Sequence, residues 1–208
     1  MATLEWISST STTITVKITG LDDSYNNRQR TVFWGCGTAY PDPPSTAIPN
    51  KRKETDPITL SGFSAGKTYT INGNILYYGY VDGKEESFTK PISCKAKTRP
   101  SKFSWEYSDV AQGKDAIKSA TDWNNLTQNI NEVRAYRKAN GYTVSSPTEY
   151  SFTTAVKGHD ITADMFNELL HAIKGISGYG TWFRDFDSGE ECTAQLLNSV
   201  VTELNTIP

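Results

Sequence analysis

One pattern occurs three times in the second half of this chain, and it constrains the fold more than any other feature. The clearest copy, Gly158 to Ile173, reads G-H-D-I-T-A-D-M-F-N-E-L-L-H-A-I. Gly189 to Leu204 reads G-E-E-C-T-A-Q-L-L-N-S-V-V-T-E-L, and Ser119 to Ile130 reads S-A-T-D-W-N-N-L-T-Q-N-I. The copies share Ser or Thr, then Ala, a large apolar residue, Asn, and Leu or Val, at fixed spacing. Such repetition predicts a repeated structural unit.

Each copy opens with the signals of a helix start. A hydroxyl side chain can accept a hydrogen bond from the first turn, so we expect N-caps at Ser119, Thr162 and Thr193. Ile161 and Phe166 flank one cap at the spacing of a hydrophobic staple, which Cys192 and Leu197 repeat. Apolar residues then recur at helical spacing; they include Trp123, Phe166, Leu169, Leu170, Ile173, Leu197, Val200, Val201 and Leu204. The pattern predicts three short amphipathic helices that pack on one another or on a partner.

Asn124, Asn167 and Asn198 occupy the same slot of the repeat. They are candidates either for ligand contacts or for bonds to the backbone of an adjoining connection that fix how the units pack. We favour the backbone role, because a residue that occurs once per unit usually serves the unit.

An aromatic lead-in precedes each unit. The three lead-ins contain Phe103, Trp105 and Tyr107, then Tyr150 and Phe152, then Trp182 and Phe183. The first helix is predicted from about residue 120 to 139, because Asn140-Gly141 is a good helix stop. The sequence thus predicts a small, mainly α-helical domain over residues 103–208, with units near 113–139, 158–176 and 189–205.

The first half has the alternation of β-strands. Residues 12–18 read T-T-I-T-V-K-I, and further strands are expected around Leu4 and Trp6, at 31–35 and at 87–97. Asp82-Gly83 is a hairpin signal. The proline-rich stretch 40–57 predicts a surface loop, with the cluster Lys51-Arg52-Lys53 at a solvated tip or against an acidic partner.

The segment from Ile58 to Ile75 resembles the E–F corner of fibronectin type III domains. The matching residues are Leu60, Gly62, Phe63, Gly66 and Tyr69, with Phe63 and Ala65 in place of the usual Leu and Pro. The resemblance implies an Ig-like β-sandwich over residues 1–99, in which Tyr69 forms a tyrosine corner and bonds back to the preceding connection. The fold class expected for the whole chain is α+β, in two domains.

The repeated units, with a last helix ending L-N-T-I-P, are similar to a module of tailed-bacteriophage and prophage structural proteins. This resemblance implies a non-enzymatic virion protein. The N-terminal residues M-A-T-L-E-W-I lack the basic and apolar blocks of a signal peptide, so we expect no cleaved export signal. The helical module would dock on other virion proteins or form a homo-oligomer, leaving the sandwich displayed. A tail, baseplate or fibre position is the first choice; capsid decoration and a module binding host-surface glycans are the alternatives.

Chemistry-bearing residues are sparse. A net charge of −2 gives no basic footprint for nucleic acid, and no apolar run is long enough for a membrane helix. His159 and His171 lack the spacing of a catalytic triad or metal site. Residues 185–191 (D-F-D-S-G-E-E) have too few oxygen ligands for a calcium loop. We therefore expect no metal, no cofactor and no enzymatic activity.

The cysteines and the exposed aromatics complete the candidates. Cys36, Cys94 and Cys192 have no metal-ligand spacing, and we interpret them as reduced, buried residues. The aromatic candidates for contact with a partner or glycan are Tyr78, Tyr80, Trp182 and Phe183. A role in the core or in a subunit interface is favoured over glycan binding.

Overall fold

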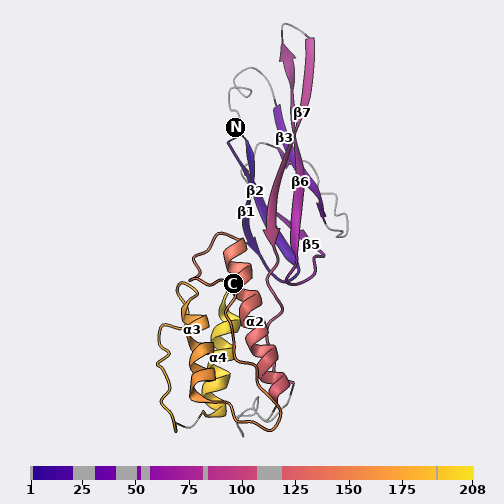
Figure 1. The fold of residues 1–208 in the computed structure, drawn as a ribbon. Coiled ribbons are helices and arrows are strands. Elements are labelled where there is room, and N and C mark those ends of the chain that lie inside the picture. The colour runs from indigo at the N-terminus through magenta and orange to yellow at the C-terminus, as the bar shows by residue number, and fades with distance from the viewer. Residues whose placement is uncertain are drawn as a thin grey trace. The chain divides into compact units, whose positions relative to one another are not determined.

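The computed structural model describes residues 2–20, 31–40, 51–52, 57–81, 84–106, 119–190 and 192–208; for 31–40, 51–52, 76–81 and 85–89 it describes the backbone only. The chain divides into two compact units, Met1–Arg99 and Pro100–Pro208 (Figure 1). The division falls at the Arg99-Pro100 step, where the sequence changes from β alternation to helical periodicity. Antiparallel sheets make up the first unit and helices the second.

In the part of the first unit that the structure describes, the strands form two antiparallel sheets. Its strands are β1 (Thr3–Ser9), β2 (Thr13–Thr19), β3 (Thr31–Tyr40), β4 (Lys51–Arg52), β5 (Ile58–Ser61), β6 (Thr68–Val81) and β7 (Lys84–Lys97). One sheet has the order β1-β2-β5, and the other has the order β4-β3-β6-β7. The strands β6 and β7 pair along their whole length, from Thr68 with Lys97 to Val81 with Lys84, as the Asp82-Gly83 turn signal predicts (Figure 1).

Alternation places the core of this unit. Along β2, Ile14, Val16 and Ile18 are buried, while the residues between them are half-buried. Residues of both sheets share one apolar cluster; its members include Leu4, Ile14, Val16, Leu60, Ile71, Ile75 and Ile92. A strand whose side chains alternate between two faces can bury every second residue in this way.

Two parts of the first unit differ from the sequence-based expectation. The strand expected at 31–35 extends to Tyr40, and Lys51–Arg52 forms a strand within the predicted proline-rich loop. β4 pairs with β3 on one side only and lies at a sheet edge, which is where a proline-rich segment can join a sheet. Lys53 lies outside the described residues.

Tyr69, at the start of β6, closes the corner after β5. Its ring is buried, and its hydroxyl accepts a hydrogen bond from the backbone N–H of Ser64 at 3.0 Å. Phe63 packs against this ring, with 4.7 Å between ring centroids. The back-bond to the preceding connection is therefore present, as expected for this residue.

The described residues of the second unit form three helices, α2 (Ala120–Ala139), α3 (Ala163–Lys174) and α4 (Ala194–Thr206), which lie side by side (Figure 1). Their N-caps are Ser119, Thr162 and Thr193, and each side chain accepts a hydrogen bond from the N–H three residues on. One apolar cluster joins all three helices; it includes Trp123, Leu126, Phe166, Leu169, Ile173, Leu197, Val200 and Leu204. The repeated stripe is therefore the core.

Arg134 of α2 is fully buried and organises the connection that leads to α3. Its Nε donates to the carbonyl of Thr148 at 3.1 Å, and Nη2 donates to the carbonyls of Ser145 at 2.9 Å and Pro147 at 2.7 Å. Nη1 donates to the carbonyl of Ala172 in the last turn of α3. Burial lowers the pKa of this guanidinium from its usual value, while Tyr150 acts in the opposite direction.

Gly175 gives the guanidinium room. A Cβ at this position would lie 2.2 Å from Ser145 Oγ and 2.6 Å from Arg134 Nη1. The backbone of Gly175 is right-handed helical (φ −69°), so the small side chain is needed for close approach and not for conformation.

We predict that Gly175→Ala destabilises the second unit. Overpacking of this kind typically costs about 1–3 kcal/mol, which outweighs the gain in helix propensity. Thermal or urea unfolding measures the effect. Adding Ser145→Ala removes the nearest clashing atom and should restore part of the loss; a Gly175→Ala variant as stable as the wild type would contradict the prediction.

Candidate functional site

Asparagine side chains hold the connections of the second unit onto its helices. Asn124 of α2 donates from Nδ2 to the carbonyl of Ala155 at 3.1 Å and accepts the N–H of the same residue at 2.9 Å. Asn131, seven residues further along α2, makes the same pair of bonds with Tyr150. Its Nδ2 donates to the carbonyl at 2.9 Å, and its Oδ1 accepts the N–H at 2.8 Å. A side-chain amide thereby satisfies both backbone groups of one residue, as a neighbouring β-strand would.

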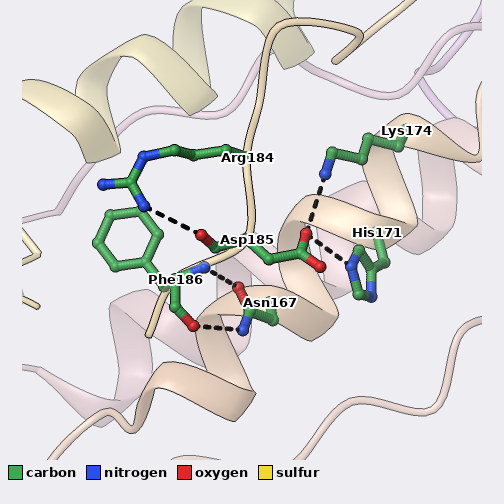
Figure 2. Close-up of polar contacts among 6 residues, drawn as sticks. All are labelled: Asn167, His171, Lys174, Arg184, Asp185 and Phe186. Carbon is green, nitrogen blue, oxygen red and sulfur yellow. Dashed lines mark hydrogen bonds and ion pairs between the residues drawn. The ribbon is translucent and has the colours of Figure 1, made fainter. Parts of the chain in front are cut away.

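The same contact occurs on α3 and α4. Figure 2 shows Asn167 of α3 bonded to Phe186, from Nδ2 to the carbonyl at 2.9 Å and from the N–H to Oδ1 at 2.7 Å. Asn205 of α4 holds both backbone groups of Phe103, each at 2.9 Å. Asn198 accepts the indole N–H of Trp105 at 2.8 Å. We call the five contacts of Asn124, Asn131, Asn167, Asn198 and Asn205 the amide clamps.

The amide clamps follow a cyclic order. Helix α2 holds the segment that leads into α3, α3 holds the segment that leads into α4, and α4 holds the segment at 103–105 that precedes α2. Asn124 and Asn167 therefore have the backbone role expected from the repeat, whereas the Asn198 amide contacts the side chain of Trp105. Asn131 and Asn205 were missed by the sequence analysis, although each follows a repeat asparagine by seven residues and so lies on the same helix face.

A polar cluster beside the Asn167 clamp holds the connection between α3 and α4. Asp185 accepts from Lys174 Nζ at 3.0 Å and lies 2.9 Å from His171 Nε2, with both contacts at Oδ1 (Figure 2). Hydrogen bonds from Lys174 and then from His171 lower the pKa of Asp185. Because fourteen residues separate His171 from its carboxylate partner, the sequence spacing gave no signal of this pair.

Arg184 and Glu190 close the same connection. The guanidinium donates to both carboxylate oxygens of Glu190, at 2.9 and 2.5 Å, and lies over the Phe186 ring. Glu190 also accepts the N–H of Asp187 at 2.9 Å. In the stretch considered as a calcium loop, Asp185 and Glu190 therefore bind cationic side chains of this chain, and Glu190 also binds a backbone N–H.

The cysteines and histidines serve packing or the surface. Cys94 and Cys192 are half-buried, and burial raises the pKa of each thiol to about 11, which keeps both protonated at neutral pH. His159 is exposed in the turn before α3. Within the described residues, no group of three His, Cys, Asp or Glu side chains could hold a metal ion. The Cys36 side chain is outside those residues.

The predicted aromatic contacts have different environments. Trp182 is 56% exposed, whereas Phe183 is buried in the helical core. The two rings are in tilted contact, with 4.1 Å between their centroids. Phe183 is therefore a core residue and cannot present its ring to a glycan. The side chains of Tyr78 and Tyr80 lie outside the described residues, so their contacts stay predictions.

Glu203 of α4 positions the turn that carries Trp182. One carboxylate oxygen accepts the N–H of Gly180 at 2.8 Å, and the other accepts the indole N–H of Trp182 at 3.5 Å. The exposed indole is thus held by a hydrogen bond to Glu203 and by contact with the Phe183 ring. An exposed, oriented Trp is suited to an interface or to stacking on a sugar.

Comparison with protein-family models gave no match, and comparison with curated proteins also gave none. Among the described residues, no helix is long and apolar enough to cross a membrane.

We predict that Asn124→Ala costs about 2 kcal/mol of unfolding free energy, because it leaves the N–H and carbonyl of Ala155 without their partner. The control is Asn125→Ala, the same change at the next residue, where the side chain is exposed. That variant should be neutral or slightly stabilised by helix propensity. Urea unfolding of both variants checks this, and equal effects would exclude a special role for the clamp.

The Asp185 cluster predicts a pH dependence. Because the folded-state pKa of Asp185 is lowered, its ion pairs stabilise the fold above the unfolded pKa of about 4 and lose this effect as the pH falls through the folded value. An NMR titration of the Asp185 carboxyl should give a midpoint below that of an ordinary Asp. Lys174→Met should raise the midpoint more than His171→Gln does; an unshifted midpoint in both variants would refute the assignment.

Proposed function

We propose that this protein is a non-enzymatic structural component of a tailed-bacteriophage particle. Its helical unit attaches it to other virion proteins, alone or as a homo-oligomer, and its β unit is displayed. A position in the tail, baseplate or fibres is our first choice. The observation that carries the proposal is the cyclic set of amide clamps. These contacts explain how the repeated units, which resemble a module of phage structural proteins, are held together.

The strand order of the first unit supports an Ig-like sandwich of fibronectin type III type. With β1 to β7 read as strands A, B, C, C′, E, F and G, the sheets become A-B-E and C′-C-F-G. Ig-like domains have their strands C, F and G together in one sheet, with C′ added beside C in some members. The Tyr69 hydroxyl bond to Ser64 lies at the E–F corner, where such domains have their tyrosine corner.

The organisation of the second unit supports an attachment role. Its charged clusters are used to hold connections: Asp185 binds Lys174 and His171, and Glu190 binds Arg184. A unit whose irregular segments are fixed in this way presents a rigid surface, and rigidity lowers the entropic cost of association.

Two alternatives remain. Capsid decoration uses the same architecture, with the β unit displayed from the head. A glycan-binding role is favoured by one observation, the 56% exposed indole of Trp182 held by Glu203. A host-surface sugar that stacks on this ring would be its ligand.

Immunogold electron microscopy of particles from producing cells tests the proposal. We expect gold at the tail tip, baseplate or fibres; gold over the heads would select capsid decoration instead. Particles from a strain that lacks the gene serve as the control for antibody specificity. If producing cells yield particles but none carries label above this control, the virion role is refuted.

A further inference from the structure

Helix α2 carries two buried arginines one turn apart, and their surroundings differ. Arg134 is fully buried with its guanidinium bonded to four backbone carbonyls. Arg137 is only 6% exposed, yet its Nε–H has no hydrogen-bond partner among the described residues. No carboxylate of the described residues forms an ion pair with Arg137. The described residues thus satisfy the guanidinium of Arg134 but leave the buried Nε–H of Arg137 without an acceptor.

Two tyrosine rings fix Arg137. Its Cζ lies 3.4 Å from the centroid of the Tyr142 ring and 5.6 Å from that of Tyr179. Both rings are half-buried, so the guanidinium is held close to the surface of the helical unit. The tyrosine faces attract the cation and hold its plane, but they cannot accept its in-plane N–H groups as oxygen atoms do.

A buried N–H without a hydrogen-bond acceptor opposes folding. The end of α2 compensates part of the charge, because Arg137 and Lys138 lie in its last turn, near the negative end of the helix dipole. The loss of water from an unpaired N–H is still uncompensated. A methionine in this place would fill a similar space and leave no buried N–H unpaired, so the unpaired Nε–H gives arginine no advantage in stability over an apolar side chain.

We propose that Arg137 anchors the helical unit to another virion protein. Its guanidinium binds a carboxylate of that protein, an Asp or Glu side chain that enters between Tyr142 and Tyr179. The planar guanidinium can bind both oxygens of a carboxylate. Arginine and tyrosine are also the residues that most often dominate the energy of protein interfaces. This inference rests on the proposed attachment role of the helical unit and names its contact residue and the chemistry of its partner.

The first measurement is the stability of the full chain with Arg137→Met. If the guanidinium serves binding, the variant should unfold at the same temperature as the wild type or higher, because an apolar side chain has replaced a buried N–H that lacks an acceptor. Lys138→Met, which removes the adjacent, exposed charge of the same helix turn, is the matched control. Clear destabilisation by Arg137→Met alone would make Arg137 a structural residue and overturn the proposal.

The second measurement is binding to particles made by a strain that lacks the gene. Purified full-length chain is added to these particles, and the bound amount is determined after sedimentation. Arg137→Met should bind at least about tenfold more weakly than the wild type, as expected for loss of an interface anchor. Arg137→Lys should also be weakened, because lysine keeps the charge but cannot make the two-pronged contact. Lys138→Met should bind like the wild type.

The outcomes separate this inference from the proposed function. Wild-type chain that binds no particle would overturn the attachment role itself. Wild-type binding with equal binding by Arg137→Met, or with equal losses in the Arg137 and Lys138 variants, would overturn only the anchor. A competition experiment tests the chemistry of the partner. If glucuronate displaces the chain from the particles and acetate at equal ionic strength does not, the site binds an acidic sugar and the proposal of a protein partner is overturned.

Discussion

Buried backbone N–H and C=O groups need hydrogen-bond partners, and the helical unit depends on how it meets this need outside its helices. The connections that lead into α3 and α4 are long and largely irregular, yet they run against the apolar core. Asparagine amides bond to one backbone residue at a time, as at Ala155 and Phe186. An asparagine on a helix face therefore serves in place of a strand, which explains why the repeat keeps an amide beside its large apolar residue.

The cyclic order of the amide clamps makes the unit cooperative. Each helix binds the segment that precedes the next helix in the cycle. Displacing one helix would therefore also break the hydrogen bonds that hold the following segment. Arg134 adds a second link between the same elements, because it bonds both the segment at 145–148 and the last turn of α3. Contacts of this kind are individually modest, and the structure gains from their mutual support.

Local signals were readable from the sequence, whereas contacts between distant segments were not. The N-caps at Ser119, Thr162 and Thr193 depend on a few neighbouring residues, and the alternation of Ile14, Val16 and Ile18 is visible in a short window. The pair His171–Asp185 and the buried state of Arg137 arise only when the segments meet in the fold. The burial of Phe183 beside the exposed Trp182 was also unpredictable, since adjacent positions in a turn have no fixed period.

The clamp between Asn205 and Phe103 brings together the two ends of the helical unit, which are separated by almost its entire sequence. The first described residues of the unit are thus held by an amide clamp, like the segments between its helices. A circular permutant that joins residue 208 to residue 100 and opens at the exposed turn near Gly158 would retain every clamp. Such a chain would begin with a different helix and still form the same cyclic set of contacts. The fold of this unit therefore does not depend on which of its helices comes first in the chain.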